Sequence, residues 1–128
     1  MHLELDGNSL TIDQLNSWLE TADGTIGISD AAWIQVEKAR SAVDKWIAEE
    51  RVVYGMTTGF GEFANVFIPN AQVEQLQENL IISHSAGMGE LLPKKVTLCM
   101  MVLRINALSK GFSGIRRSTL EAMIAMVN

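Results

Sequence analysis

The chain has 128 residues, of which 48% are hydrophobic, and its formal net charge at pH 7 is −5. That length suits one domain or a piece of a larger one, and the apolar content is sufficient for a packed core, so a disordered chain is excluded. An acidic balance without a run of lysine and arginine argues against nucleic acid or a membrane surface as the main partner.

The first twenty residues predict an extended segment followed by a short helix. They lack the basic stretch and long apolar core of a secretory signal, so we expect a cytoplasmic protein. Residues 3–10 alternate weakly around residues 6–9, which predicts a short hairpin or an extended arm. Thr11 and Gln14 then match a helix capping box. The helix that follows has one apolar face, formed by Leu15, Trp18 and Leu19, and residues 22–24 end it.

A second, longer helix is predicted from residue 29 or 30 to about residue 50. Ser29 or Asp30 supplies its cap. Its apolar residues recur at three- and four-residue steps: Trp33, Val36, Ala39, Val43, Trp46 and Ile47. That spacing predicts one buried face. The β-branched residues 52 and 53 then lead into a glycine-rich loop.

A third helix begins after this loop, with Asn70 as its cap. Its apolar face comprises Val73, Leu76 and Leu80. It ends near Ser83-His84, because two glycines follow closely.

The last two predicted helices differ in polarity. The fourth starts at Pro93 and ends at Gly111, and it is apolar nearly all round, so we expect other chain segments or subunits to cover it. Its most apolar run, residues 96–103, is too short to cross a bilayer. Residues 118–121 match a second capping box, and the helix they open presents Leu120, Met123, Ile124 and Val127. The fold class is therefore mainly α.

The loop at residues 54–61, Tyr-Gly-Met-Thr-Thr-Gly-Phe-Gly, is the first candidate for chemistry. Three glycines leave its backbone free to adopt positive φ angles, and its hydroxyls and rings can face a ligand. It is neither a phosphate-binding loop nor a dinucleotide fingerprint, because the spacing and the following residues differ from both. Composition alone favours an ordinary connection between helices.

The remaining candidates are single side chains. His84 lies between two serines at a helix end, where it can reach a substrate or only cap the last carbonyls, and the second role is the commoner one. Cys99 lies in the apolar helix and is interpreted as core. Arg116 and Arg117, with Lys110, suit a carboxylate or a neighbouring subunit, although solvated charges at helix ends are commoner. With two histidines and one cysteine, no metal-ligand spacing exists.

Three motifs in order resemble those of the aromatic amino-acid ammonia-lyases and aminomutases. They are the loop at residues 54–61, residues 76–80 continuing through 83–89, and residues 104–117. The resemblance implies the helical fold related to fumarase and aspartase, assembled as a homotetramer. It also implies a methylidene-imidazolone prosthetic group, which forms from an Ala-Ser-Gly tripeptide and needs no metal, and a small aromatic amino acid as substrate.

The same resemblance implies roles for individual residues. Tyr54 matches the catalytic tyrosine proposed to remove the β-proton of the substrate. Because a free phenol has a pKa of about 10, such a base depends on close alignment within a closing loop. Gly61 matches a backbone position that lines the substrate. His84 matches a position that faces the substrate ring, and Ser83-His84 together are similar to the histidine-specific members.

The sequence departs from this family in one respect, because it contains no Ala-Ser-Gly tripeptide. We therefore expect residues 1–128 to be one N-terminal segment of a larger lyase, inactive by itself. The leading hypothesis for the whole enzyme is conversion of L-histidine to trans-urocanate and ammonia. The alternatives are a tyrosine or phenylalanine ammonia-lyase or 2,3-aminomutase and, from another class, a non-catalytic helical oligomerisation module.

Overall fold

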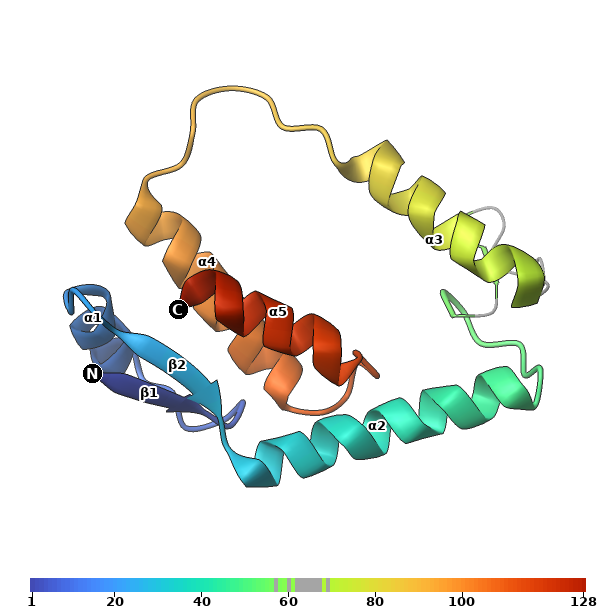
Figure 1. Cartoon of the computed structure of the whole chain (residues 1–128), viewed down its shortest axis with the longest axis horizontal. Coiled ribbons are helices and arrows are strands. Elements are labelled where there is room, and N and C mark those ends of the chain that lie inside the picture. The colour runs from blue at the N-terminus through green and yellow to red at the C-terminus, as the bar shows by residue number, and fades with distance from the viewer. Residues whose placement is uncertain (57, 60, 62–67, 69) are drawn as a thin grey trace. The chain divides into compact units, whose positions relative to one another are not determined.

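The computed structural model describes residues 1–56, 58, 59, 61, 68 and 70–128, except for the side chains of residues 70, 71 and 73. The chain divides into two compact units. Unit 1 comprises residues 1–42 and 91–128, and unit 2 comprises residues 43–90. The elements are β1 (His2–Leu5), α1 (Ile12–Leu19), β2 (Thr25–Ile28), α2 (Asp30–Ala48), α3 (Asn70–His84), α4 (Lys94–Ser109) and α5 (Arg117–Val127) (Figure 1). The prediction of a mainly helical fold is confirmed.

The two strands form a small parallel sheet in unit 1. β1 pairs with β2 from His2 opposite Thr25 to Leu5 opposite Ile28. The hairpin predicted for residues 3–10 is therefore wrong, although the extended segment is present. Parallel strands need a crossover, and α1 provides it. The alternation in residues 3–10 belongs to a strand whose partner lies beyond that helix.

One hydrophobic core fills unit 1. Both strands bury alternate residues against the helices, and α4 and α5 lie side by side over them (Figure 1). Five large side chains of this cluster are fully buried: Leu5, Val36, Val102, Ile105 and Leu120. Gly111 ends α4 at φ +72°, and a side chain there would collide with the backbone of Gln35 in α2. This close approach requires glycine.

The two predicted capping boxes have different outcomes. At α1, Thr11 Oγ1 accepts the N–H of Gln14, and the Gln14 side chain accepts the N–H of Thr11, so the prediction is confirmed. At α5 the prediction is wrong, because the helix already begins at Arg117 and its cap residue, Arg116, makes no side-chain cap bond. The Glu121 carboxylate accepts from Arg117 Nε at 2.8 Å instead.

The start of α2 and the end of α3 agree with the sequence, whereas the prediction of Asn70 as a cap concerns a side chain outside the described ones. Ser29 Oγ accepts the Ala32 N–H at 3.3 Å, so Ser29 is the cap of α2. Along its predicted apolar face, Val36 and Val43 are buried. α3 ends at His84 as predicted. The prediction for Val73 lies outside the described side chains.

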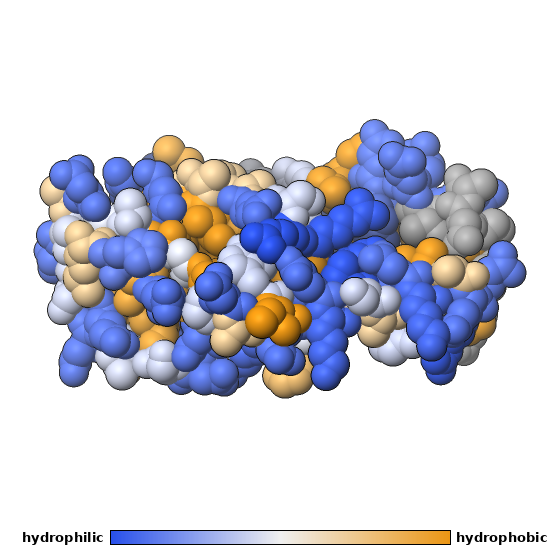
Figure 2. All heavy atoms as spheres, turned by 60° about the horizontal axis from the view of Figure 1, so that its bottom comes forward, coloured by the Kyte–Doolittle hydropathy of each residue, from blue (hydrophilic) through white to orange (hydrophobic). Residues whose placement is uncertain are grey.

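The predicted cover of α4 is incomplete. Its inner face is buried through Val102, Ile105 and Leu108, but Val96, Met100 and Leu103 are exposed. Hydrophobic side chains reach the surface between hydrophilic ones on the face drawn in Figure 2. Within the described part of the chain, no helix is both long and apolar enough to cross a membrane.

Candidate functional site

The sequence-predicted site residues all lie in unit 2, on two segments. Tyr54 is on the glycine-rich loop, where residues 54–56 form a turn and the Met56 N–H donates to the Val53 carbonyl at 3.1 Å. Gly55 takes φ +70° in this turn, in the left-handed region that favours glycine. The Tyr54 side chain is 64% exposed. The turn therefore presents an aromatic hydroxyl at the surface of the unit.

Gly61 lies at the other end of the loop. Its φ is +59°, and a Cβ placed on it would meet no described atom within 4 Å. The backbone angle alone therefore favours glycine at this position. Two further residues of the predicted loop, Thr57 and Phe60, lie outside the described residues.

Ser83 and His84 are in direct contact at the exposed end of α3. His84 Nδ1 lies 2.9 Å from Ser83 Oγ and 3.0 Å from the Leu80 carbonyl oxygen. Ser83 Oγ donates to the same carbonyl at 2.9 Å. Three polar atoms thus form a triangle on the last turn of the helix.

This triangle favours the tautomer of His84 in which the outward-facing ring nitrogen is an acceptor. A carbonyl oxygen only accepts hydrogen bonds, so Nδ1 must carry a proton to bond with Leu80. The Ser83 hydroxyl uses its own proton on the same oxygen. In the neutral ring, Nε2 is then the unprotonated nitrogen. The side chain of His84 is exposed, so Nε2 can accept a hydrogen bond from a ligand.

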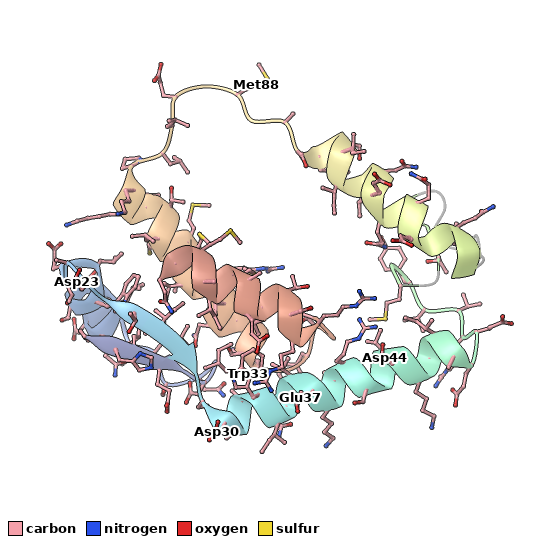
Figure 3. All side chains as sticks on the ribbon, viewed as in Figure 1. Asp23, Asp30, Trp33, Glu37, Asp44 and Met88 are labelled. Carbon is pink, nitrogen blue, oxygen red and sulfur yellow. The ribbon has the colours of Figure 1, made fainter. Side chains whose placement is uncertain are left out.

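Among the basic residues considered from the sequence, Arg117 makes contacts with another helix of the protein. The Arg117 guanidinium stacks over the Trp33 ring at 4.5 Å and contacts Glu37 and Glu121. Hydrogen bonds from Arg117 to Glu121 and then Glu37 raise its pKa above the ordinary value. Trp33 and Glu37 lie four residues apart along α2, on the same side of the helix (Figure 3). Arg117 therefore joins α5 to α2.

Cys99 is partly buried and packs against the unit 1 core, as its interpretation as a core residue predicted. Among the described residues, no group of three or more histidine, cysteine, aspartate or glutamate side chains is placed to hold a metal ion.

The expectation that the loop hydroxyls face a ligand is wrong for Thr58, and its bonds to the backbone of its own loop were not predicted from the sequence. Thr58 is fully buried, and its Oγ1 accepts the Gly55 N–H at 3.3 Å and donates to the Gly59 carbonyl at 3.0 Å. Two adjacent threonines in the loop look alike in the sequence, so only their surroundings distinguish them. A threonine within three residues of a positive-φ glycine is nevertheless a known local partner for backbone groups.

Comparison with known proteins gives consistent results. The sequence profile of the family described as "Aromatic amino acid lyase" matches residues 10–128. A histidine ammonia-lyase of Halalkalibacterium halodurans is 45% identical over 97% of this chain, which spans 24% of that protein.

Two solved structures show the same fold. The histidine ammonia-lyase from Trypanosoma cruzi is 42% identical with a TM-score of 0.89, over 99% of this chain and 25% of its own. The tyrosine aminomutase from Streptomyces globisporus is 29% identical with a TM-score of 0.87, over all of this chain and 24% of its own. The chain thus spans about a quarter of the length of the proteins that it matches.

Proposed function

The chain belongs to the aromatic amino acid lyase family, and from that premise we propose that it is one N-terminal segment of a longer carbon–nitrogen lyase acting on L-histidine. The products would be trans-urocanate and ammonia. The observation that carries the proposal is the contact of His84 Nδ1 with Ser83 Oγ and the Leu80 carbonyl, in a chain 45% identical to a histidine ammonia-lyase.

The proposal gives each described residue a separate task. Tyr54, exposed on its turn, takes the β-proton of the substrate. His84 binds the substrate ring through Nε2, and Ser83 supports it by holding Nδ1. Gly61 lines the substrate with its backbone, because it has no side chain and no described atom lies within 4 Å of a Cβ placed on it.

The family's methylidene-imidazolone would have to come from elsewhere in the longer protein, because these 128 residues lack the Ala-Ser-Gly tripeptide. The described residues are compatible with a group supplied from outside the chain, since Tyr54 is exposed and no described atom lies within 4 Å of a Cβ placed on Gly61. When bound, that group supplies an electrophile that makes the β-proton of the substrate acidic enough to remove.

The proposed acceptor on His84 also predicts the order in which the enzyme prefers its substrates. The imidazole N–H of histidine and the phenol O–H of tyrosine can each donate to Nε2, whereas the phenyl ring of phenylalanine has no donor. A site that hydrogen-bonds its substrate strongly rejects an analogue that lacks the bonding group. The second candidate is therefore a tyrosine ammonia-lyase or aminomutase, and the similarity of this chain to a tyrosine aminomutase supports this candidate.

The test is turnover of L-histidine, L-tyrosine and L-phenylalanine by the longer protein. Ultraviolet absorbance reports the unsaturated product, and an ammonia assay separates a lyase from an aminomutase, which retains the amino group. We expect urocanate to form fastest, Tyr54→Phe to lower kcat by about 100-fold or more, and His84→Gln to weaken the preference for histidine. His2→Gln changes the only other histidine and is the matched control.

Three results would count against the proposal. Turnover of none of the three amino acids would favour the non-catalytic helical module, and unchanged turnover in Tyr54→Phe would remove the proposed base. We further expect the 128-residue chain alone to release no ammonia, and release above background would contradict its description as one part of the enzyme.

We also propose that the longer protein assembles as a homotetramer and is located in the cytoplasm. The exposed apolar side chains of α4, namely Val96, Met100 and Leu103, support self-association, since contiguous apolar surface is rarely left in water. Sedimentation velocity on the longer protein tests the assembly, and a monomer at micromolar concentration would contradict it.

A further inference from the structure

Thr58 is a buried polar residue that the proposed reaction does not use. It has 0% of its surface exposed, although Tyr54, four residues earlier, is 64% exposed. Burying a hydroxyl is unfavourable unless it is hydrogen-bonded. The Thr58 hydroxyl makes two such bonds, accepting from the Gly55 N–H at 3.3 Å and donating to the Gly59 carbonyl at 3.0 Å.

These two bonds connect the residue after Tyr54 to the far side of the loop. A backbone bond from the Met56 N–H to the Val53 carbonyl closes the turn at residues 54–56. The bond from Gly55 to Thr58 is a further constraint on the same turn. Gly55, at φ +70°, has no side chain to restrict its backbone, so it gains conformational freedom when this constraint is removed.

We propose that Thr58 is a positioning residue, whose buried hydroxyl fixes the turn at residues 54–56 and so sets the direction in which Tyr54 leaves the loop. Its effect on catalysis rests on the proposed function, but its effect on the turn concerns this chain alone. A β-branched side chain of the same size without the hydroxyl, as in Thr58→Val, fills the same space and removes both bonds.

The first test is amide hydrogen exchange of Gly55 in the 128-residue chain, measured by NMR. We expect exchange in Thr58→Val to be roughly two- to tenfold faster, as the loss of one net hydrogen bond predicts. Thr58→Ser keeps the hydroxyl and should exchange like the wild type. Thr97→Val, the same change at an exposed position of α4, is the matched control. Unchanged Gly55 exchange in Thr58→Val would overturn the proposal, as would equal acceleration throughout α3.

Tyr54 provides a second readout, because it is the only tyrosine of the chain. Ring-labelled tyrosine therefore gives one set of signals, without assignment by mutagenesis. We expect these signals to shift or double in Thr58→Val and to stay in place in Thr58→Ser and Thr97→Val. Signals that stay in place in Thr58→Val would overturn the proposal. If that variant does not fold, Thr58→Ala compared with Thr58→Ser provides the same comparison.

The consequence for catalysis is measured in the longer protein with L-histidine. Misplacing the base should lower kcat roughly 10- to 100-fold in Thr58→Val and leave KM nearly unchanged, and Thr58→Ser should restore most of the rate. Unchanged kcat, or a rise in KM alone, would overturn the positioning role in the reaction. If the unsubstituted enzyme turns over no aromatic amino acid, the proposed function is contradicted instead. The hydrogen exchange of Gly55 then still tests the role of Thr58 in the turn.

Discussion

At the scale of single residues, Asp6 turns the chain between β1 and α1. Its carboxylate accepts the N–H of Asn8 at 2.7 Å and of Ser9 at 2.8 Å. The bond from Ser9, followed by that from Asn8, lowers the pKa of this carboxyl below its ordinary value of 3.8. Gly7, at φ +85°, donates its N–H to Asn106 Oδ1 at 2.9 Å, which joins the turn to α4.

The lowered pKa of Asp6 predicts a specific pH dependence. Because the folded pKa lies below the unfolded one, the stabilisation is present above pH 3.8 and is lost as the pH falls through the folded value. Asp6→Asn keeps an acceptor but cannot ionise, and charged acceptors form the stronger hydrogen bonds. We expect the wild type to unfold at higher urea than Asp6→Asn at pH 6–7, and the two midpoints to converge towards pH 3.

The measurement is urea denaturation followed by tryptophan fluorescence across this pH range. Asp23→Asn, the same substitution at an exposed aspartate between α1 and β2 (Figure 3), controls for the removal of one negative charge. A constant difference between wild type and Asp6→Asn at every pH would show that the carboxylate does not contribute through ionisation.

Single residues also show how much of the site is predictable. The sequence predicts Tyr54 on a loop and Ser83 and His84 at a helix end, because glycine spacing and apolar periodicity are local signals, and the structure places them there. The partner of His84 Nδ1 was not predictable in the same way. It depends on the rotamers of two side chains around the Leu80 carbonyl. Their catalytic and binding roles stay predictions.

At the scale of helices and strands, the two capping motifs show where local sequence is sufficient. Thr11 and Gln14 bond each other's backbone N–H, so the motif determines the start of α1 without distant contacts. Residues 118–121 fit the same pattern, but α5 begins one residue before them. Arg117 packs on Trp33 and forms an ion pair with Glu37. These contacts with α2 stabilise Arg117 as the first residue of α5.

This difference predicts unequal effects of one substitution at the two sites. Thr11→Ala should lower the free energy of unfolding by about 1 kcal/mol, because it removes a cap that satisfies the Gln14 N–H. Ser118→Ala should change it by less than about 0.5 kcal/mol, because Ser118 lies inside α5, where alanine is the better helix former. Urea denaturation measures both, and equal losses would mean that Ser118 acts as a cap in solution.

The parallel sheet shows where local sequence is not sufficient to predict the structure. Residues 3–10 carry the alternation of a strand, yet nothing near them in sequence identifies residues 25–28 as the partner. The pairing depends on α1 as a crossover and on burial of Leu3, Leu5, Ile26 and Ile28 in one core. Asn128 contributes from still further along the chain. Its side-chain amide accepts the Ile26 N–H at 2.8 Å and donates to the Ile26 carbonyl at 3.1 Å.

At the scale of the whole molecule, the described hydrophobic core lies within one of the two compact units. Every residue of the main buried cluster belongs to residues 1–42 or 91–128, which form unit 1. The proposed catalytic residues, Tyr54 and His84, belong to unit 2. Both are exposed. Stability and the proposed chemistry are thus carried by different parts of the chain.

This separation predicts that a cavity in unit 1 leaves the local order of unit 2 intact. Ile105 is fully buried in α4, and Ile105→Ala should lower the free energy of unfolding of unit 1 by about 2–5 kcal/mol. Met100, in the same helix, is 57% exposed, and Met100→Ala should change it by less than about 0.5 kcal/mol.

Hydrogen exchange resolved by segment distinguishes the two units. In Ile105→Ala we expect faster exchange in β1, β2 and α4, which line the core, and wild-type exchange in α3, which contributes no residue to the main buried cluster. Equal acceleration in α3 would mean that the units unfold together as one cooperative body. In that case a stability change anywhere in the core would also alter the population of the Tyr54 turn, and variants of the loop would have to be compared at matched stability.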